Sequence, residues 1–167
     1  HGQSEGKYVT FGVAAEGVTG NALKFTVPNS GNTLKAYVRT SGINLDNITA
    51  GYYKLTAYVK TNNTKSYMYV GTSNSATFTA DGQWNKVTLE NVQLTDSGAN
   101  LTAVVDDDGN VNGNGYELGF NIVPDTTATG DTYVLIDDIC LERTGDLTPP
   151  APVVNNMLSN ASFEDAT

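Results

Sequence analysis

The sequence predicts an all-β domain, a two-sheet antiparallel β-sandwich. Short segments that alternate apolar and polar residues recur along the chain, and clusters of Asn, Gly, Asp and Ser separate them. This alternation is the period of a half-buried strand, and no window shows sustained helical spacing. The 167 residues are rich in Thr, Asn, Gly and Tyr. β-Branched and aromatic residues favour strands, whereas Asn and Gly favour turns.

Each expected strand is an alternating run that ends at a turn signal. In YELGFNIV the pattern turns Leu118, Phe120 and Ile122 inward. In YYKLTAYVK one face carries Tyr53, Leu55, Ala57 and Val59. The expected strands, in order, are KYVTFGV, ALKFTV, LKAYVRT, YYKLTAYVK, SYMYV, ATFTA, WNKVTLENVQL, LTAVV, YELGFNIV and TYVLIDDICLE. Strands at this spacing without helices between them are typical of a sandwich.

The chain divides into a body, a linker and a tail. We expect the β-sandwich at residues 1–145, a Pro-rich linker at 146–154 and a strand-like tail at 155–167. Consecutive prolines cannot join a sheet ladder and favour a stiff extended segment. The tail reads NNMLSNASFEDAT. It either begins a following module, docks as a strand on this domain or on a neighbouring copy, or is an ordered tail without such a role.

Composition limits the partners. The net charge of −9 and the pI of about 4.3 argue against nucleic acid, which is bound by clustered Lys and Arg. Neutral ligands or cations are the natural partners. No apolar run reaches the length of a membrane span. The single cysteine, Cys140, excludes an internal disulfide and shares the parity of Ile136, so we expect it to be buried.

The residues predict a protein that is not an enzyme. His1 is the only histidine, which removes Ser-His-Asp and Cys-His catalysis and histidine-bound zinc. The acidic residues lie in turns and in the sequence LIDDI, not at opposed positions on aromatic-rich strands. A pair of opposed carboxylates is what glycoside hydrolysis would need.

Several polar and aromatic residues are candidates for one ligand-binding face. Tyr58, Tyr67 and Tyr69 have matching parity on consecutive expected strands. Proteins bind sugars with aromatic platforms and with amide, carboxylate or guanidinium groups. If the faces converge, they form a tyrosine-lined groove; the alternative is that these tyrosines are simply good sheet formers. The candidates are Tyr37, Arg39, Tyr58, Tyr67, Tyr69, Glu117 and Asn121.

Two stretches are candidates for cation binding. In LIDDI, Asp137 and Asp138 are adjacent in an apolar strand. One of them faces the core side, where a cation or strong hydrogen bonds must compensate it. The second stretch, DDDGNVNGNGYE, matches the front half of an EF-hand loop from Asp108, but Gly119 stands where the closing Glu is needed. We interpret it as a long turn between strands.

Four segments in order resemble one family. They are GNALKFTV, LDNITAGYYKLTAYVKT, FTADGQWNKVTLE and YVLIDDICLE, which together span Gly20 to Glu142. They are similar to carbohydrate-binding modules of the four/nine grouping, which are galactose-binding-like jelly rolls. The resemblance implies a jelly-roll β-sandwich. The first-strand motif of that family, N-L-L-S-N-x-S-F-E-D-G, is matched here only at the carboxyl end.

The resemblance also implies a structural Ca²⁺. Its ligands would be Asp137 or Asp138, Glu164 of the carboxyl-terminal motif, and backbone from Gly17 to Asn21. Oxygen-only ligands suit calcium, a hard cation with flexible geometry.

The expected function is non-catalytic binding of a neutral polysaccharide, of β-glucan or xylan type, in a tyrosine-lined groove. The family implies a secreted or cell-surface location in a bacterial multimodular protein, with neighbouring modules as further partners. The alternative is a structural or assembly repeat that binds no glycan and associates with its own copies by strand exchange.

Overall fold

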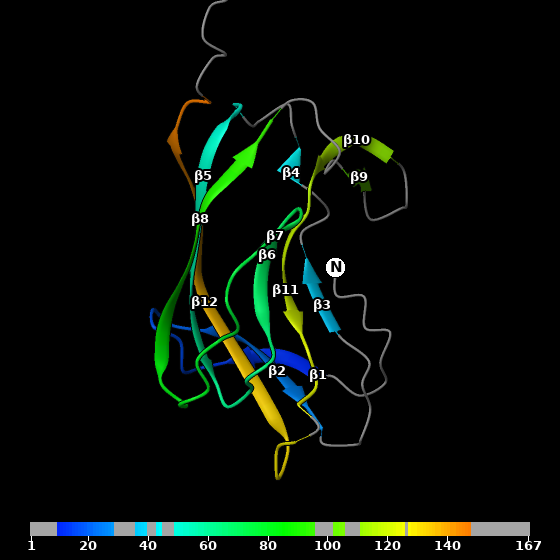
Figure 1. The fold of residues 1–167 in the computed structure, drawn as a ribbon. Coiled ribbons are helices and arrows are strands. Elements are labelled where there is room, and N and C mark those ends of the chain that lie inside the picture. Colours follow the sequence, from blue (N-terminus) through cyan, green and yellow to red (C-terminus); the bar gives the residue numbers. More distant parts are fainter. Residues whose placement is uncertain are drawn as a thin grey trace, which may run out of the picture.

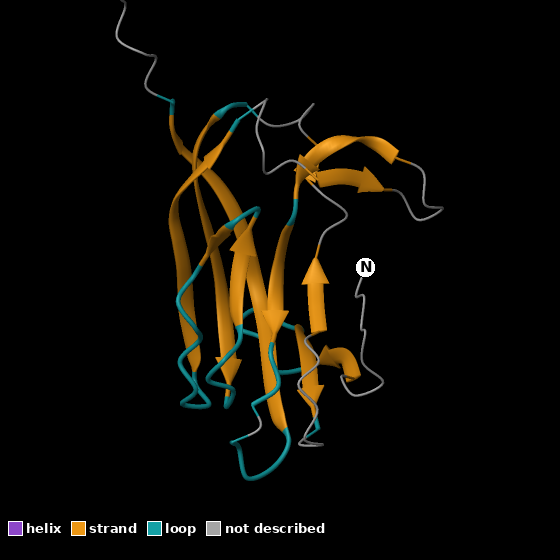
Figure 2. Cartoon of the chain, turned by 45° about the vertical axis from the view of Figure 1, so that its right-hand side comes forward, coloured by secondary structure: helices purple, strands orange, loops and turns teal. Residues whose placement is uncertain are grey.

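Every regular element in the described part of the chain is a β-strand, as Figure 2 shows. The structure is a computed structural model that describes residues 10–28, 36–39, 43–44, 49–95, 102–105, 111–125 and 127–147. Within these ranges no helix is long and apolar enough to cross a membrane. The described body reaches residue 147, so the expected tail at 155–167 lies outside it.

The strands form antiparallel sheets of five, four and three strands (Figure 1). The five-stranded sheet has the order β1 (Thr10–Ala14), β2 (Ala22–Val27), β12 (Thr132–Gly145), β5 (Gly51–Thr61) and β8 (Trp84–Leu94). The four-stranded sheet has the order β3 (Ala36–Arg39), β11 (Leu118–Ile122), β6 (Tyr67–Val70) and β7 (Ser73–Asn74). The small sheet has the order β4 (Ile43–Asn44), β10 (Val111–Tyr116) and β9 (Thr102–Val105). The all-β antiparallel prediction is therefore confirmed, and the arrangement is consistent with a β-sandwich.

The hydrophobic core lies between the five-stranded and four-stranded sheets. Along β5 every second residue is buried, as the alternation predicts, and Leu55 and Val59 are among them. From the facing sheet, Met68 and Phe120 join the same cluster of buried side chains. Leu118, Phe120 and Ile122 are all buried, so their predicted inward direction is confirmed. Removing such side chains from water is the main favourable term in folding.

Two local expectations need correction. The segment 76–80 is not a strand but an irregular connection between β7 and β8. Its Phe78 is nevertheless buried, with its ring centroid 6.5 Å from that of Phe120. The apolar alternation thus indicated burial correctly and secondary structure wrongly. The second expectation, a long turn after Asp108, is wrong for residues 111–116, because they form β10 and pair with β9.

A β-bulge in β12 exposes Cys140, against the prediction that it is buried. Ile136 pairs with Val59 and Cys140 with Thr56, so four steps along β12 match three along β5. Asp138, in the interruption, has φ of 47°, in the left-handed region. One extra residue in a strand reverses which face the following residues occupy. Parity counted from Ile136 therefore fails beyond the bulge.

The strand β1 ends the five-stranded sheet and carries exposed apolar side chains. Phe11 is 70% exposed and Val13 is 73% exposed. They stand opposite Phe25 and Leu23 of β2, which contribute to the core or pack against it. The core side of β1 is thus left open to solvent at these positions, a feature that sheet edges usually avoid.

A buried polar network holds the turn after β5 against the segment that leads into β12. Asn63, which is 0% exposed, donates to the carbonyl of Val123 at 2.8 Å and accepts from Ser66. Asp125, which is 7% exposed, accepts from the hydroxyls of Thr64 and Thr127, both at 2.6 Å. These bonds hold the pKa of Asp125 well below its usual range, first through Thr127 and then through Thr64.

Candidate functional site

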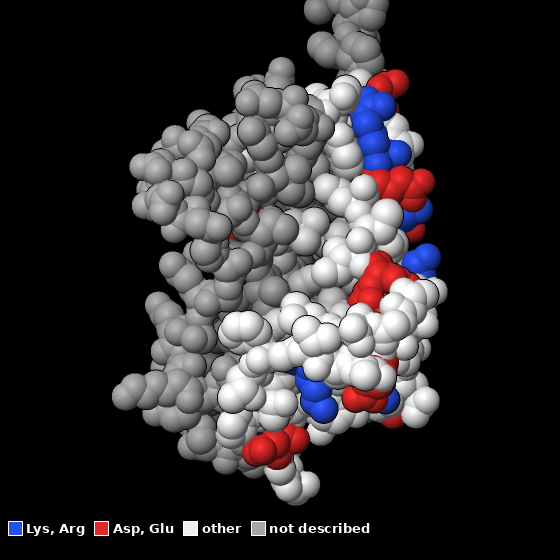
Figure 3. All heavy atoms as spheres, turned by 180° about the vertical axis from the view of Figure 1, so that it is seen from behind, with Lys and Arg blue, Asp and Glu red and all other residues white. Residues whose placement is uncertain are grey.

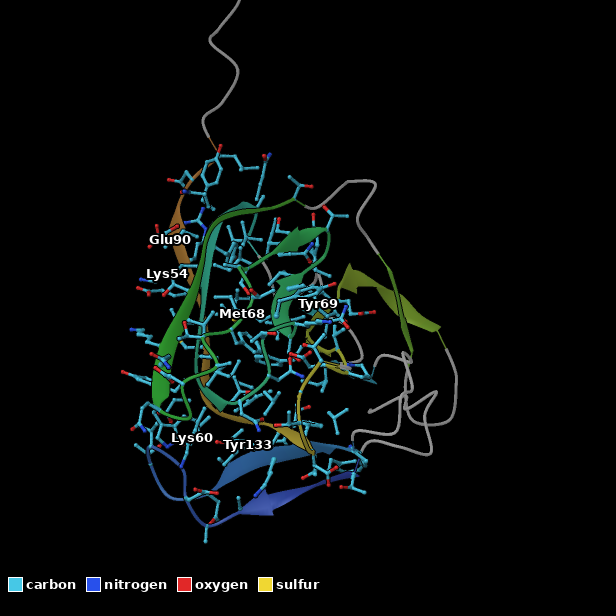
Figure 4. The ribbon with its side chains drawn as sticks, turned by 60° about the horizontal axis from the view of Figure 1, so that its bottom comes forward. Lys54, Lys60, Met68, Tyr69, Glu90 and Tyr133 are labelled. Carbon is cyan, nitrogen blue, oxygen red and sulfur yellow. The ribbon has the colours of Figure 1, made fainter. Side chains whose placement is uncertain are left out.

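The outer face of the four-stranded sheet gathers most of the predicted ligand residues. On β6, Met68 is fully buried in the core, so Tyr67 and Tyr69 belong to the opposite face. Figure 4 shows Met68 on the side of β6 toward the five-stranded sheet and Tyr69 on the other side. On β11, Asn121 stands opposite Tyr67 and Gly119 opposite Tyr69. Both therefore share that face.

The register also brings β3 to this face. Tyr37 stands opposite Asn121 and Arg39 opposite Gly119 on β11. The sheet thus has one row of Tyr37, Asn121 and Tyr67 and a second row of Arg39, Gly119 and Tyr69. For Tyr37 and Arg39 the structure describes the strand position only. We call these six positions, together with Glu117, the tyrosine face.

Hydrogen bonds join side chains within the tyrosine face. Asn121 donates from Nδ2 to the Tyr67 hydroxyl at 2.6 Å. The Tyr69 hydroxyl donates to the carboxylate of Glu117, which lies between β10 and β11. Tyr67 is half-buried, whereas Tyr69 and Asn121 are 8% and 5% exposed. Each pair links a phenol to an amide or acid, the groups that bind sugar hydroxyls.

The structure does not bring Tyr58 to the tyrosine face. Tyr58 lies on β5 of the other sheet, in register with Lys86 and Asp137 and facing away from the core. The alternation of β5 correctly predicted that Tyr58 faces away from the core, but alternation does not tell to which sheet a strand belongs. Sheet membership depends on pairing between distant segments, and local alternation carries no signal for it.

The outer face of the five-stranded sheet has a different chemistry, with charges of both signs side by side. Lys54 pairs with Glu142 at 2.9 Å and Lys60 with Glu16 at 3.0 Å. Figure 4 shows Lys54 and Lys60 on this side, and Figure 3 shows basic and acidic atoms interleaved along its edge. Contact with Lys60 lowers the pKa of Glu16. Exposed pairs of this kind contribute little to stability.

The predicted metal-site residues come together at one turn. The segment 15–21 passes over β12, where the Thr19 amide donates to Asp137 Oδ2 at 3.1 Å and its hydroxyl donates to Asp138 Oδ1 at 2.7 Å. Gly17 lies so close that an added Cβ would stand 2.6 Å from Asp137 Oδ2 and 2.9 Å from the carbonyl carbon of Asn21. Gly17, Asn21, Asp137 and Asp138 are therefore neighbours. Glu164 lies outside the described residues.

Hydrogen-bond donors already compensate this acidic pair. Asp137 accepts from the amide of Thr19 and, through Oδ1, from the amide of Asp138 at 2.9 Å. The Thr19 amide is the main cause of the lowered pKa of Asp137. In the described residues no group of three or more acidic, histidine or cysteine side chains could hold a metal. Calcium takes six to eight oxygen ligands, so these residues alone do not make a full site.

The second acidic stretch does not have the form of a calcium loop. Residues 106–110 lie outside the described part, and 111–116 form β10 with an irregular register against β9. A ladder strand cannot wrap a cation as the second half of an EF-hand loop does.

Two residues of these sites escaped sequence reasoning. Thr19, which bonds both aspartates, is one threonine in a chain rich in threonine. Gly119, central on the tyrosine face, gives no pattern of its own because its role depends on its neighbours across the sheet. A glycine inside a strand signals a close approach in general terms.

No family model and no curated protein matches this chain.

Proposed function

We propose that this chain is a non-catalytic carbohydrate-binding domain that holds a neutral polysaccharide, of β-glucan or xylan type, against the tyrosine face. The observation that carries the proposal is the register of β3, β11 and β6. It collects Tyr37, Arg39, Tyr67, Tyr69 and Asn121 from three strands on one face. The same face also carries the amide of Asn121 and the carboxylate of Glu117, each bonded to one of its tyrosines.

The chemistry of the face suits a sugar chain. A phenol ring presents an apolar surface to the C–H face of a pyranose, and its hydroxyl remains a polar handle. Amide and carboxylate groups supply acceptors and donors for the hydroxyl rim. The net charge of −9 disfavours acidic glycans.

Affinity electrophoresis of single-residue variants tests the proposal. Soluble mixed-linkage β-glucan, xylan and mannan are the probes. We expect Tyr67→Ala to weaken binding about tenfold, the effect of losing a contact of roughly 1.4 kcal/mol. The control is Tyr58→Ala, the same exchange at a half-buried position on the other sheet. It should bind like the wild type.

The outcomes separate cleanly. A wild-type chain that no polysaccharide retards would overturn the proposal. Equal loss of binding in both variants would move the site off the tyrosine face.

The wider setting follows from the resemblance and remains part of the proposal. It comprises jelly-roll connectivity, a secreted or cell-surface location in a bacterial multimodular protein, and neighbouring modules on the same chain. Structural calcium is also a proposal: Asp137, Asp138 and backbone from Gly17 to Asn21 would hold it together with Glu164. When bound, the ion would supply positive charge to the acidic pair.

A second candidate function is self-association by strand addition. The exposed Phe11 and Val13 on the terminal strand β1 favour it, because an apolar sheet edge is a template for another strand. The segment 155–167 of a neighbouring copy is the proposed partner. Light scattering after gel filtration should then give a larger mass for the full chain than for a chain ending at Gly145 or for Phe11→Lys. Equal monomeric masses for all three would exclude it.

A further inference from the structure

We infer that Asn121 selects the ligand, by accepting a hydrogen bond from one sugar hydroxyl at its Oδ1. This inference rests on the proposed function. In the residues whose side chains are described, Asn121 Oδ1 is the one buried side-chain polar atom without a hydrogen-bond partner. The other end of the same carboxamide is bonded, since Nδ2 donates to Tyr67.

Asn121 differs from Asn63, the other asparagine that is buried in the part of the chain the structure describes. Asn63 accepts at Oδ1 from the amides of Lys65 and Ser66 and from the Ser66 hydroxyl, each at 2.9 Å. A buried acceptor left without a donor costs folding free energy, and native structures contain few of them. Each such group in a folded protein needs an explanation, and a ligand that supplies the missing donor is the explanation that fits the proposed function.

The position of Asn121 suits the recognition of a sugar hydroxyl. It lies on β11, between β3 and β6, with Tyr37 opposite on one side and Tyr67 on the other. Gly119, two residues away on the same face, is also buried and contributes no side chain. The amide is therefore at the centre of the tyrosine face, flanked by aromatic residues.

An unpartnered acceptor defines the chemistry of its ligand. Only a hydrogen-bond donor satisfies it, so carboxylate and sulfate groups are rejected while a sugar hydroxyl is accepted. A site built to bond a hydroxyl strongly rejects an analogue that lacks it, because the protein group is then left buried and unpaired. Asn121 would thus confer selectivity for a neutral saccharide with a free hydroxyl at one ring position.

Binding at this oxygen requires a local movement. Oδ1 is covered in this structure, so a ligand hydroxyl reaches it only when a neighbouring group is displaced. Tyr67 is half-buried and bonded to the same carboxamide, which makes its ring the described group best placed to move. The hydrogen bond from the sugar hydroxyl to Asn121 and the movement of the Tyr67 ring would then occur together.

The first test compares the ligand-free stability of the full chain with that of Asn121→Leu. Leucine has a similar size and needs no partner, so we expect the melting temperature to stay the same or rise. A structural amide would behave in the opposite way. A fall of about 5 °C or more, or failure to fold, would overturn the inference.

The second test measures binding of cellotetraose and xylotetraose by calorimetry. Each is used unmodified and with single hydroxyls replaced by fluorine, which cannot donate. For the wild type we expect one replacement to weaken binding about tenfold. For Asn121→Leu, we expect weaker binding of the parent sugar and no further loss with that same analogue. The control is Asn85→Leu on β8, which should behave like the wild type.

The failures are distinguishable. If the wild type binds neither sugar, the inference fails together with the proposed function. If the wild type binds and Asn121→Leu keeps the same sensitivity to every replacement, only the role of Asn121 is overturned.

Discussion

The Tyr69 hydroxyl donates a hydrogen bond to the carboxylate of Glu117. The two residues come from β6 and from the junction between β10 and β11, 48 positions apart in the sequence. The bond therefore fixes the junction against the four-stranded sheet at one end of the tyrosine face.

This pair should show measurable coupling. Bonds to charged groups contribute about 1.5–3 kcal/mol. We expect Tyr69→Phe and Glu117→Gln each to lower the free energy of unfolding, and the double variant to lose less than the sum of the two. Urea unfolding of all four proteins measures the coupling. Strictly additive effects would mean that the two side chains do not stabilise one another.

Gly17 should not tolerate a methyl group. An added Cβ would stand 2.6 Å from Asp137 Oδ2 and 2.9 Å from the carbonyl oxygen of Gly20, so the turn must move off β12. We expect Gly17→Ala to cost about 1–3 kcal/mol, the range for disrupting a packed polar contact. Gly12→Ala is the control, because nothing lies within 4 Å of its added Cβ. Its melting temperature, measured by thermal unfolding, should equal that of the wild type or be slightly higher. Equal losses in both variants would contradict the close approach.

Asp125 should make stability sensitive to acid. Its folded pKa lies below the ordinary value of 3.8, so its contribution is fully present above that value and is lost as the pH falls below it. We expect Asp125→Asn to melt lower than the wild type at pH 6, with the gap shrinking toward pH 2. Glu90→Gln, which removes an exposed carboxylate from β8, is the control. If the difference in melting temperature between the two proteins stays constant with pH, the charge of Asp125 does not contribute to stability.

Calcium, if it binds, should raise the melting temperature. A ligand that binds only the folded state stabilises it by mass action, so millimolar Ca²⁺ after EDTA treatment should shift the wild type upward by several degrees. Asp138→Asn should reduce the shift while keeping the backbone, since Asn also tolerates a positive φ. No shift in the wild type would mean that the donors from Thr19 and the Asp138 amide suffice.

Local alternation predicted the strands and their inner faces well because burial follows a period of two. The fully buried Leu55 and Phe120 are examples. It could not predict that Tyr58 and Tyr67 lie on different sheets. Both face away from the core, and only the pairing of distant strands assigns them to different sheets. It also misplaced Cys140, because a bulge changes the count within a single strand. Phe78 shows the converse case, a residue whose apolar character predicted burial without predicting a strand.

The bulge in β12 has a consequence for how this strand tolerates change. Asp137 pairs with Tyr58 and Cys140 with Thr56, so the ladder needs only one of the two residues between them. Shortening the strand by one position there would leave both flanking registers intact. What would be lost is one of the two hydrogen bonds from Thr19 to β12, the one that its hydroxyl donates to Asp138. The bond from the Thr19 amide to Asp137 would remain. Hydrogen exchange in a chain lacking Asp138 should then show unchanged protection of the β12 amides and faster exchange in the 15–21 turn.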